Sequence, residues 1–159
     1  MDSFTDFKFA PGRDGVWDLV VDEANRDLAM TDGMETAVLF SLFSDRRAAP
    51  DEVANPWRRR GWIGNLVPDV PGDNFGSGIW LYEQRRGTSD VLSSLRLEAI
   101  SSLSWMVPSI ASSVDASFAY EPKTRRFSVL CSVTTPGGSS SSHAFDLWRK
   151  TAPTTISNT

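Results

Sequence analysis

The chain is poor in the residues that usually bind metals or form disulfides. Of its 159 residues, only Cys131 is a cysteine and only His143 is a histidine. A single cysteine allows neither an intrachain disulfide nor a cysteine-based zinc cage. Because Cys131 lies in the apolar run 127–133, we interpret it as a small buried hydrophobe. His143 follows a serine-rich loop and has no second histidine with which to share a metal, so we expect no metal and no cofactor.

Lysine is also scarce, because 13 of the 16 basic residues are arginine. The net charge of −4 argues against nucleic-acid binding through a generally basic surface. The arginines form clusters at 46–47, 58–60, 85–86 and 125–126. Guanidinium groups pair bidentately with carboxylates, which favours contacts with other proteins over a merely solvated surface.

Long apolar runs are absent, since no stretch approaches the roughly 18 to 20 residues that a membrane helix needs. The polar, acidic start 1–8 is unlike a secretory signal, so we expect synthesis in the cytoplasm. The apolar share of 40% and the aromatic share of 11% are typical of a packed domain. We expect one domain over 1–150, followed by a flexible tail over 151–159.

Alternating patterns predict strands at both ends of the chain. Residues 6–9 and 16–21, with turn residues at 11–15 between them, predict an N-terminal hairpin, and 27–30 a further short strand. Runs at 114–120, 126–134 and 142–148, separated by turns, predict a C-terminal three-strand antiparallel meander.

Three helices are predicted between them. The first spans 34–47, with Asp32 as N-cap, Glu35 at capping-box spacing and Arg46 and Arg47 in its last turn. The second spans 79–86, and the third runs from a cap at Thr88 or Ser89 to about residue 107. The fold class is therefore α+β, with a small mixed or antiparallel sheet packed on two to three helices.

The connection 48–78 is too long and too apolar for a flexible linker, so we expect an ordered loop packed on the body or on a partner. Its most distinctive segment is 57–62, Trp-Arg-Arg-Arg-Gly-Trp. Tryptophan and arginine are common at the centres of protein interfaces, which favours a protein-binding loop. Two alternatives stay open, a structural anchor with solvated arginines and a site where single-stranded nucleic acid stacks.

No catalytic constellation emerges from the sequence. The glycine-rich stretch 72–78 lacks the Gly-Lys-Ser/Thr of a phosphate loop and predicts a turn before a helix. Eight carboxylates have no apolar setting that would raise a pKa, so we interpret them as surface acids: Asp18, Asp22, Glu23, Asp27, Asp32, Glu35, Asp51 and Glu52. A serine nucleophile would need an activating base in a recognisable motif. We therefore expect a protein that is not an enzyme.

Four ordered segments resemble the Mu-like phage baseplate family. They are 31–48 (TDGMETAVLFSLFSDRRA), 60–65 (RGWIGN), 76–81 (GSGIWL) and 145–148 (FDLW). In that family a corresponding helix leads to an RGWWGD loop and then to a second helix. Ile63 and Asn65 depart from the tryptophan and aspartate of that loop.

The resemblance implies a structural baseplate wedge protein of a contractile tail, similar to the T-even phage wedge protein that initiates the sheath. It implies six copies in the tail baseplate of a virion or a phage-derived tail device, assembled in the host cytoplasm. The implied partners are wedge core proteins and the tail sheath protein, with tube or hub proteins as further candidates, and no nucleic acid and no membrane. A lysozyme-like label on the T-even relative keeps a cell-wall hydrolase as the alternative.

Sheath subunits of such tails add a neighbour's strand to an exposed sheet edge, which the closing meander would offer. We expect Asp45, Arg46 and Arg47 to pair with the loop 48–78 or with a wedge neighbour. Charge reversal at both arginines should leave a folded monomer but block its entry into baseplates. The expected partner interface comprises Asp45, Arg46, Arg47, Trp57, Arg58, Arg59, Arg60, Trp62, Phe145, Leu147 and Trp148.

Overall fold

The computed structural model describes residues 5–11, 17–32, 34–66 and 75–147. Its C-terminal half contains the predicted meander, with strands β7 (Ser113–Glu121), β8 (Arg126–Thr134) and β9 (Ser140–Leu147) in the order β7-β8-β9. Both pairings are antiparallel, and Phe127 lies opposite Tyr120 on one side and Leu147 on the other. The predicted strand bounds are confirmed to within two residues. Trp148 and the tail 151–159 lie outside the described residues.

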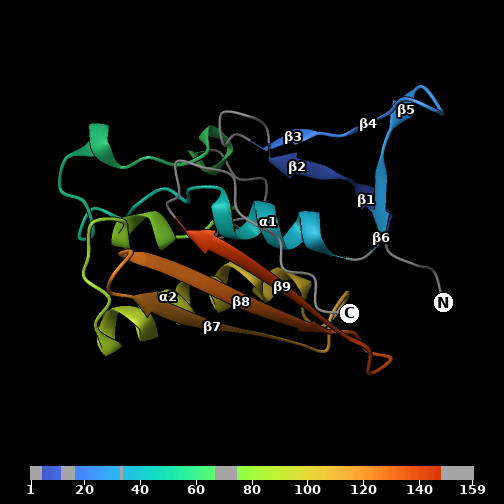
Figure 1. The fold of residues 1–159 in the computed structure, drawn as a ribbon. Coiled ribbons are helices and arrows are strands. Elements are labelled where there is room, and N and C mark those ends of the chain that lie inside the picture. Colours follow the sequence, from blue (N-terminus) through green and yellow to red (C-terminus); the bar gives the residue numbers. More distant parts are fainter. Residues whose placement is uncertain (1–4, 12–16, 33, 67–74, 148–159) are drawn as a thin grey trace.

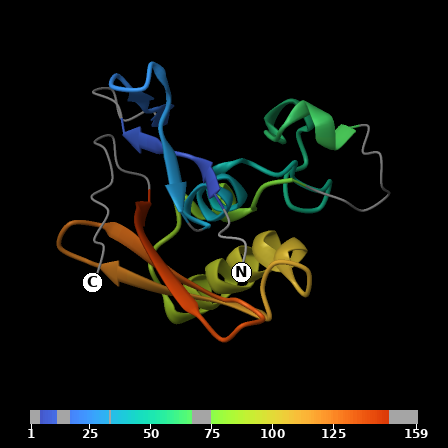
Figure 2. The same ribbon diagram turned by 90° about the vertical axis from the view of Figure 1, so that its right-hand side faces the viewer.

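Helix α2 (Ser89–Leu103) covers the inner face of this sheet (Figures 1 and 2). The Thr88 hydroxyl accepts a hydrogen bond from Val91 N at 3.4 Å, as the predicted cap requires. Leu95, Ala99 and Leu103 are fully buried on the side that faces the sheet. A 3-10 turn, η4 (Ser104–Met106), ends the helical segment, so the predicted third helix is confirmed apart from its last turn.

Helix α1 (Glu35–Phe43) is shorter than predicted at both ends. Its N-cap is Met34, without a side-chain cap, so the predicted capping box at Asp32 is wrong. Residue 32 instead ends strand β6, and a residue that pairs in a strand cannot also begin the helix. The helix stops at Ser44 because residues 44–46 pair in an extended conformation with Ser77, and Arg46 and Arg47 therefore lie beyond its last turn.

The N-terminal region is a three-armed strand junction rather than one hairpin. Strand β1 (Thr5–Phe7) pairs with β6 (Met30–Asp32), β2 (Phe9–Pro11) with β3 (Trp17–Leu19), and β4 (Val21–Asp22) with β5 (Asp27–Leu28). The arms meet where Lys8 N donates to Ala29 O (2.8 Å), Ala29 N to Val20 O (2.8 Å) and Val20 N to Lys8 O (3.0 Å). The predicted hairpin is thus confirmed only for β2 and β3. Most of its predicted turn lies outside the described residues.

Short 3-10 turns form the middle of the chain, namely η1 (Pro56–Arg58), η2 (Ile63–Leu66) and η3 (Ile79–Tyr82). The predicted helix 79–86 is wrong in type and length. Its backbone bonds run over three residues, from Leu81 N to Gly78 O and from Glu83 N to Trp80 O. The Trp80 side chain donates a hydrogen bond to the backbone carbonyl of Arg46, just beyond the end of α1, and this bond holds the segment in a tight turn.

The hydrophobic core lies where α1, α2, η3 and the sheet meet. Val38 and Leu42 of α1 are buried in it, together with the inward residues Phe127, Val129 and Val133 of β8. Cys131 is a free, buried thiol whose pKa is raised to about 12 by burial, which confirms its interpretation as a small hydrophobe. No helix in the described part of the chain has the length and apolarity to cross a bilayer.

Candidate functional site

Three of the sequence motifs converge at the end of α1. Asp45 and Ser77 form a parallel backbone bridge, in which Ser77 N donates to Ser44 O at 2.8 Å and Arg46 N donates to Ser77 O at 3.0 Å. The third motif joins through Trp62 N, which donates to Asp45 O at 3.1 Å. We call this convergence of 44–46, 60–62 and 76–80 the motif junction. It fixes the start and the end of the loop 48–78 to the same point of the body.

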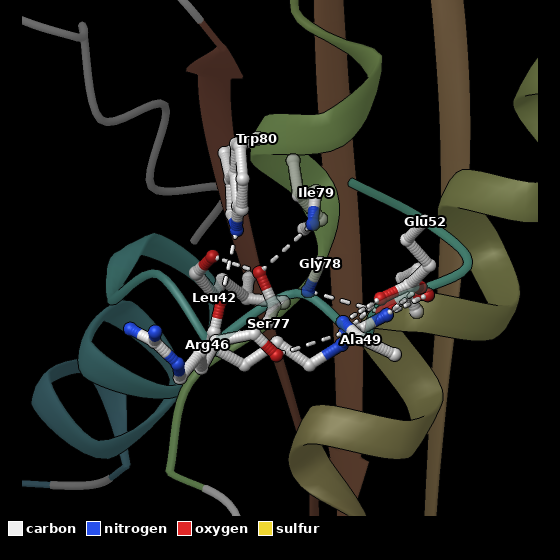
Figure 3. A network of polar contacts seen from close by, with 10 residues as sticks. Leu42, Arg46, Ala49, Glu52, Ser77, Gly78, Ile79 and Trp80 are labelled. Carbon is white, nitrogen blue, oxygen red and sulfur yellow. Dashed lines mark hydrogen bonds and ion pairs between the residues drawn. The ribbon is translucent and has the colours of Figure 1, made fainter. Parts of the chain in front are cut away.

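Ser77 locks the junction to α1 (Figure 3). Its buried hydroxyl donates to Leu42 O at 2.5 Å and accepts from Ile79 N at 3.3 Å. The hydroxyl thus satisfies a carbonyl that the end of a helix otherwise leaves without a partner. Beside it, Gly76 has φ of +95° and would place a Cβ against Ser44 O, so only glycine fits there without strain. The glycine-rich stretch therefore forms a turn in its described part, 75–78.

Arg46 is the centre of the junction. Its guanidinium binds Glu52 bidentately, with Nη1–Oε2 at 2.8 Å and Nη2–Oε1 at 2.6 Å. It also binds Glu98 of α2, with Nε–Oε2 at 3.2 Å and Nη2–Oε1 at 2.9 Å. Gly78 N donates to Glu98 Oε2 at 3.0 Å, and Ala49 N to Glu52 Oε2 at 2.8 Å. This network ties α1, the loop and α2 together (Figure 3).

The electrostatics of the network favour a structural role. Hydrogen bonds from Arg46 lower the pKa of Glu52 to about 2, and the same bonds raise the pKa of the Arg46 guanidinium further above its ordinary value. The arginine side chain is only 21% exposed and that of Glu98 only 19%. A carboxylate with so low a pKa stays ionised at neutral pH and cannot donate a proton as a general acid. Glu52, interpreted from sequence as a surface acid, is therefore a paired structural residue.

A second group of contacts braces the arginine cluster of the loop. Arg60 lies 3.7 Å from Asp45 and 3.5 Å from Glu83, and its guanidinium stacks 5.0 Å from the Trp80 ring centroid. Burial raises the pKa of Asp45. Arg59 donates from Nε to Val53 O at 2.7 Å. The expected pairing of Asp45 and Arg46 with the loop therefore occurs within the chain.

Arg46 and Arg47 differ sharply in their surroundings. The exposed Arg47 makes a single long bond to the loop, from Nη2 to Pro56 O at 3.5 Å. Arg46 instead satisfies two carboxylates in a mostly buried setting. Charge reversal at Arg46 would set three carboxylates against one another, so we now expect it to destabilise the fold. The expectation that charge reversal leaves a folded monomer stays a prediction for Arg47.

Trp57 projects from the loop into solvent. Its side chain is 94% exposed, although its backbone is fixed in η1, where Asn55 Oδ1 accepts from Trp57 N at 3.0 Å. The neighbouring Arg58 is exposed, and its side chain makes no hydrogen bond or ion pair with another described residue. A partner that covers this exposed tryptophan ring would remove a large apolar area from contact with water. We call residues 55–59 the Trp57 turn. This turn presents an exposed apolar side chain on a backbone that hydrogen bonds hold in place.

Trp62 and Ile63 of the same loop are exposed as well. Trp62 packs edge-on against Phe75 with ring centroids 5.8 Å apart, and both remain partly exposed. Asn65 clamps Phe75, because its side chain donates to Phe75 O at 2.8 Å and accepts from Phe75 N at 3.0 Å. Asn65, one of the two departures from the family motif, therefore joins the segment that ends at residue 66 to the segment that begins at residue 75. Ile63, the other, is exposed.

Other expected interface residues lie elsewhere. Phe145 and Leu147 of β9 are buried, and Phe145 packs against Phe43 with ring centroids 5.5 Å apart. Their side chains fill the core and are not offered on the surface, while Trp148 lies outside the described residues. His143 is half-buried, which lowers its pKa, and it lies 3.2 Å from Ser141 Oγ. The described residues contain no cluster of three His, Cys, Asp or Glu that could hold a metal.

Sequence reasoning missed the two partners that organise the site. Glu98 lies on α2 between the buried Leu95 and Ala99, and a carboxylate beside an apolar stripe was the available signal for a buried partner. Ser77 gave no such signal, since a serine among glycines is typical of any turn.

Comparisons with known proteins place these features in a family. The family model described as "Phage protein GP46" matches residues 34–140, which include the whole motif junction. The chain is also 35% identical over 82 residues to "Baseplate protein gp46" of Escherichia phage Mu, an alignment that covers 50% of this chain and 54% of that protein. The chain therefore spans about half the length of the relative it matches. The resemblance to Mu-like phage baseplate proteins is confirmed, and the chain belongs to the family of phage protein GP46.

Proposed function

We propose that this protein is a structural component of a phage tail baseplate, in which it binds neighbouring proteins and catalyses no reaction. The observation that carries the proposal is the combination of the family with the motif junction. The family's matched region contains a network of Arg46, Glu52 and Glu98 that pins a loop to the body, and that loop presents an exposed tryptophan. Rigid display of a large apolar side chain favours tight association, because little conformational freedom remains to be lost on binding.

The finer role we propose is that of a wedge protein that initiates the sheath of a contractile tail. Six copies would link wedge core proteins to the first sheath ring, with tube or hub proteins close by. Strand β9 is an outer strand of the described sheet, so a neighbour's strand can add to it. Asp45, Arg47, Arg58, Arg59 and Arg60 would contribute polar contacts around the Trp57 turn. We also retain the proposal of one domain over 1–150.

Deletion and complementation in the phage or tail device that encodes the chain tests this role. Without the chain we expect tails with no complete baseplate, and the wild-type gene should restore them. Arg58→Glu should give a folded protein that enters baseplates poorly, because it reverses an exposed charge beside Trp57. Lys123→Glu, which reverses an exposed charge in the turn after β7, is the matched control and should enter normally. Complete baseplates in the deletion strain would refute the proposal.

The cell-wall hydrolase alternative makes a separate expectation. Purified protein would degrade peptidoglycan, and a single carboxylate substitution would abolish the activity. We expect no turnover by the wild type. Activity that survives in Glu52→Gln but disappears in another carboxylate variant would establish an enzyme and replace our proposal.

A further inference from the structure

The three-armed strand junction at the N-terminal end carries exposed apolar side chains, and its strands are only partly buried. Phe7 of β1 and Met30 of β6 are register partners, so their side chains share one face of the pair, and they are 45% and 51% exposed. Val21 of β4 is exposed as well. Each arm has only two or three paired residues, too few for an isolated hairpin to be stable in water. A partner that covers this face would therefore add the apolar contact that the arms lack.

The same region is acidic. It carries Asp6, Asp18, Asp22, Glu23 and Asp27, against Lys8 and Arg26. No ion pair joins these groups in the described parts of the chain. Within the described residues, Asp18 and Asp27 accept hydrogen bonds only from the next backbone N–H. Hydrogen bonds from Asn25 lower the pKa of Asp22. The described part of this region thus carries five acidic and two basic side chains on the same junction as exposed Phe7 and Met30.

The Trp57 turn has the complementary character. Arg47 and Arg59 donate only to backbone carbonyls within the described residues, and Arg58 is exposed beside the 94% exposed tryptophan. The guanidinium groups of Arg47, Arg58 and Arg59 can therefore donate hydrogen bonds to carboxylates of another molecule. The Trp57 turn has an apolar ring flanked by arginines, and the Phe7–Met30 face has apolar side chains flanked by aspartates. The two surfaces are therefore both apolar at the centre and opposite in charge. Methionine adapts readily to an aromatic ring.

The two surfaces lie at opposite ends of the protein. In Figure 1 the three-armed junction, in blue, projects at one end, and the loop with η1, in green, lies at the other. The turned view of Figure 2 keeps them apart. One molecule therefore cannot bring its own acidic region onto its own Trp57 turn. Two copies can meet in a head-to-tail contact, which leaves one free surface of each kind and extends to rings or chains.

We propose that the Trp57 turn of one copy docks on the acidic Phe7–Met30 face of a second copy of this chain. The inference deepens the proposed function, because it names the neighbour of the loop surface within the baseplate. Trp57 supplies the apolar contact, and Arg47, Arg58 and Arg59 pair with carboxylates of the three-armed junction. The contact is heterologous, so the two surfaces are different and each is needed once per interface.

Light scattering and sedimentation of the purified full chain over a range of concentrations test the proposal. At low salt we expect oligomers that dissociate on dilution and on raising the ionic strength, because the charges are exposed and screened. Trp57→Ala and Met30→Ser should each weaken association by at least about tenfold, as hot-spot truncations do. Leu97→Ser is the matched control, since Leu97 is 66% exposed on α2, and it should associate normally. Circular dichroism confirms that each variant is folded.

Mixing the variants distinguishes a head-to-tail contact from a symmetric one. Trp57→Ala keeps an intact acidic face and Met30→Ser keeps an intact Trp57 turn, so an equal mixture should form heterodimers and nothing larger. A mixture that stays monomeric would overturn the inference. So would a wild type that is monomeric at every concentration, whether or not single-stranded DNA then binds through Trp57. A monomer that still enters baseplates would refute this contact alone, whereas tails that never contain the protein would refute the proposed function.

Discussion

Removal of the Arg46 side chain should destabilise the fold far more than removal of any exposed arginine. Arg46→Ala deletes both bidentate pairs and leaves Glu52 and Glu98 facing each other across the space of the lost guanidinium. Glu98 keeps only its bond from Gly78 N, and its side chain is 19% exposed. A carboxylate held in such a position without a counter-charge is costly because water reaches it poorly.

The magnitude follows from burial and geometry. Breaking a fully buried ion pair from one side costs about 3–5 kcal/mol. Here the groups are partly exposed, so we expect a loss of about 2–4 kcal/mol in the free energy of unfolding. A domain of this size loses roughly 2–4 °C of Tm for each kcal/mol, so the Tm should fall by about 4–16 °C. Arg58→Ala, at an exposed site, should change stability by no more than about 0.5 kcal/mol.

Chemical denaturation followed by tryptophan fluorescence measures these differences, with calorimetry for the Tm. Arg46→Lys should recover only part of the stability, because an ammonium cannot fork to two carboxylates. Arg46→Met combined with Glu52→Gln and Glu98→Met should recover most of it, since the uncompensated charges disappear together. An Arg46→Ala protein as stable as the wild type would refute the reasoning. So would a triple variant less stable than Arg46→Ala, because the loss would then come from packing.

Three further predictions concern the same junction. Because the folded pKa of Glu52 is about 2 and its ordinary value is 4.5, its stabilisation is present above pH 4.5 and is lost as the pH falls toward 2. The difference in unfolding free energy between wild type and Glu52→Gln should therefore shrink from at most about 3 kcal/mol at pH 7 towards zero near pH 2. Urea titrations at several pH values measure this difference. A difference that stays constant with pH would contradict the prediction. Ser77→Ala should cost about 1–3 kcal/mol in urea denaturation, because Leu42 O loses its buried donor, and an unchanged midpoint would exclude that role. Gly78→Ala should also destabilise the fold, because its Cβ would lie 2.5 Å from Glu98 Oε2 and 2.7 Å from Arg46 Nη2. The same substitution should cost less stability in the Arg46→Ala background. Equal effects in both backgrounds would argue against a shared network.

The elements that the sequence predicts well are those whose pattern is local. The alternation of β8 places Phe127, Val129, Cys131 and Val133 on one face, and three-residue and four-residue spacing marks the buried side of α2. Both patterns arise from burial against one neighbour, so periodicity alone identifies them. Thr88 as the cap of α2 is equally local, because its hydroxyl binds a backbone group three residues away.

The features that sequence reasoning missed depend on distant partners. The end of α1 is set by pairing with Ser77, more than thirty residues away, which replaces the last helical turn expected around Arg46. The Arg46–Glu98 pair likewise spans 52 residues. No local pattern distinguishes a paired arginine such as Arg46 from an exposed one such as Arg58. Arg46, predicted as an interface residue, is instead paired within the fold. An interface on the loop 48–78 stays a prediction.

Cryo-electron microscopy of the assembled tail base tests the central claim most directly. We predict density for this fold where the baseplate meets the first sheath ring, with the Trp57 turn buried against a neighbouring protein chain. Intact tails whose baseplates contain no copy of the protein, or a copy whose Trp57 turn faces solvent, would contradict the account.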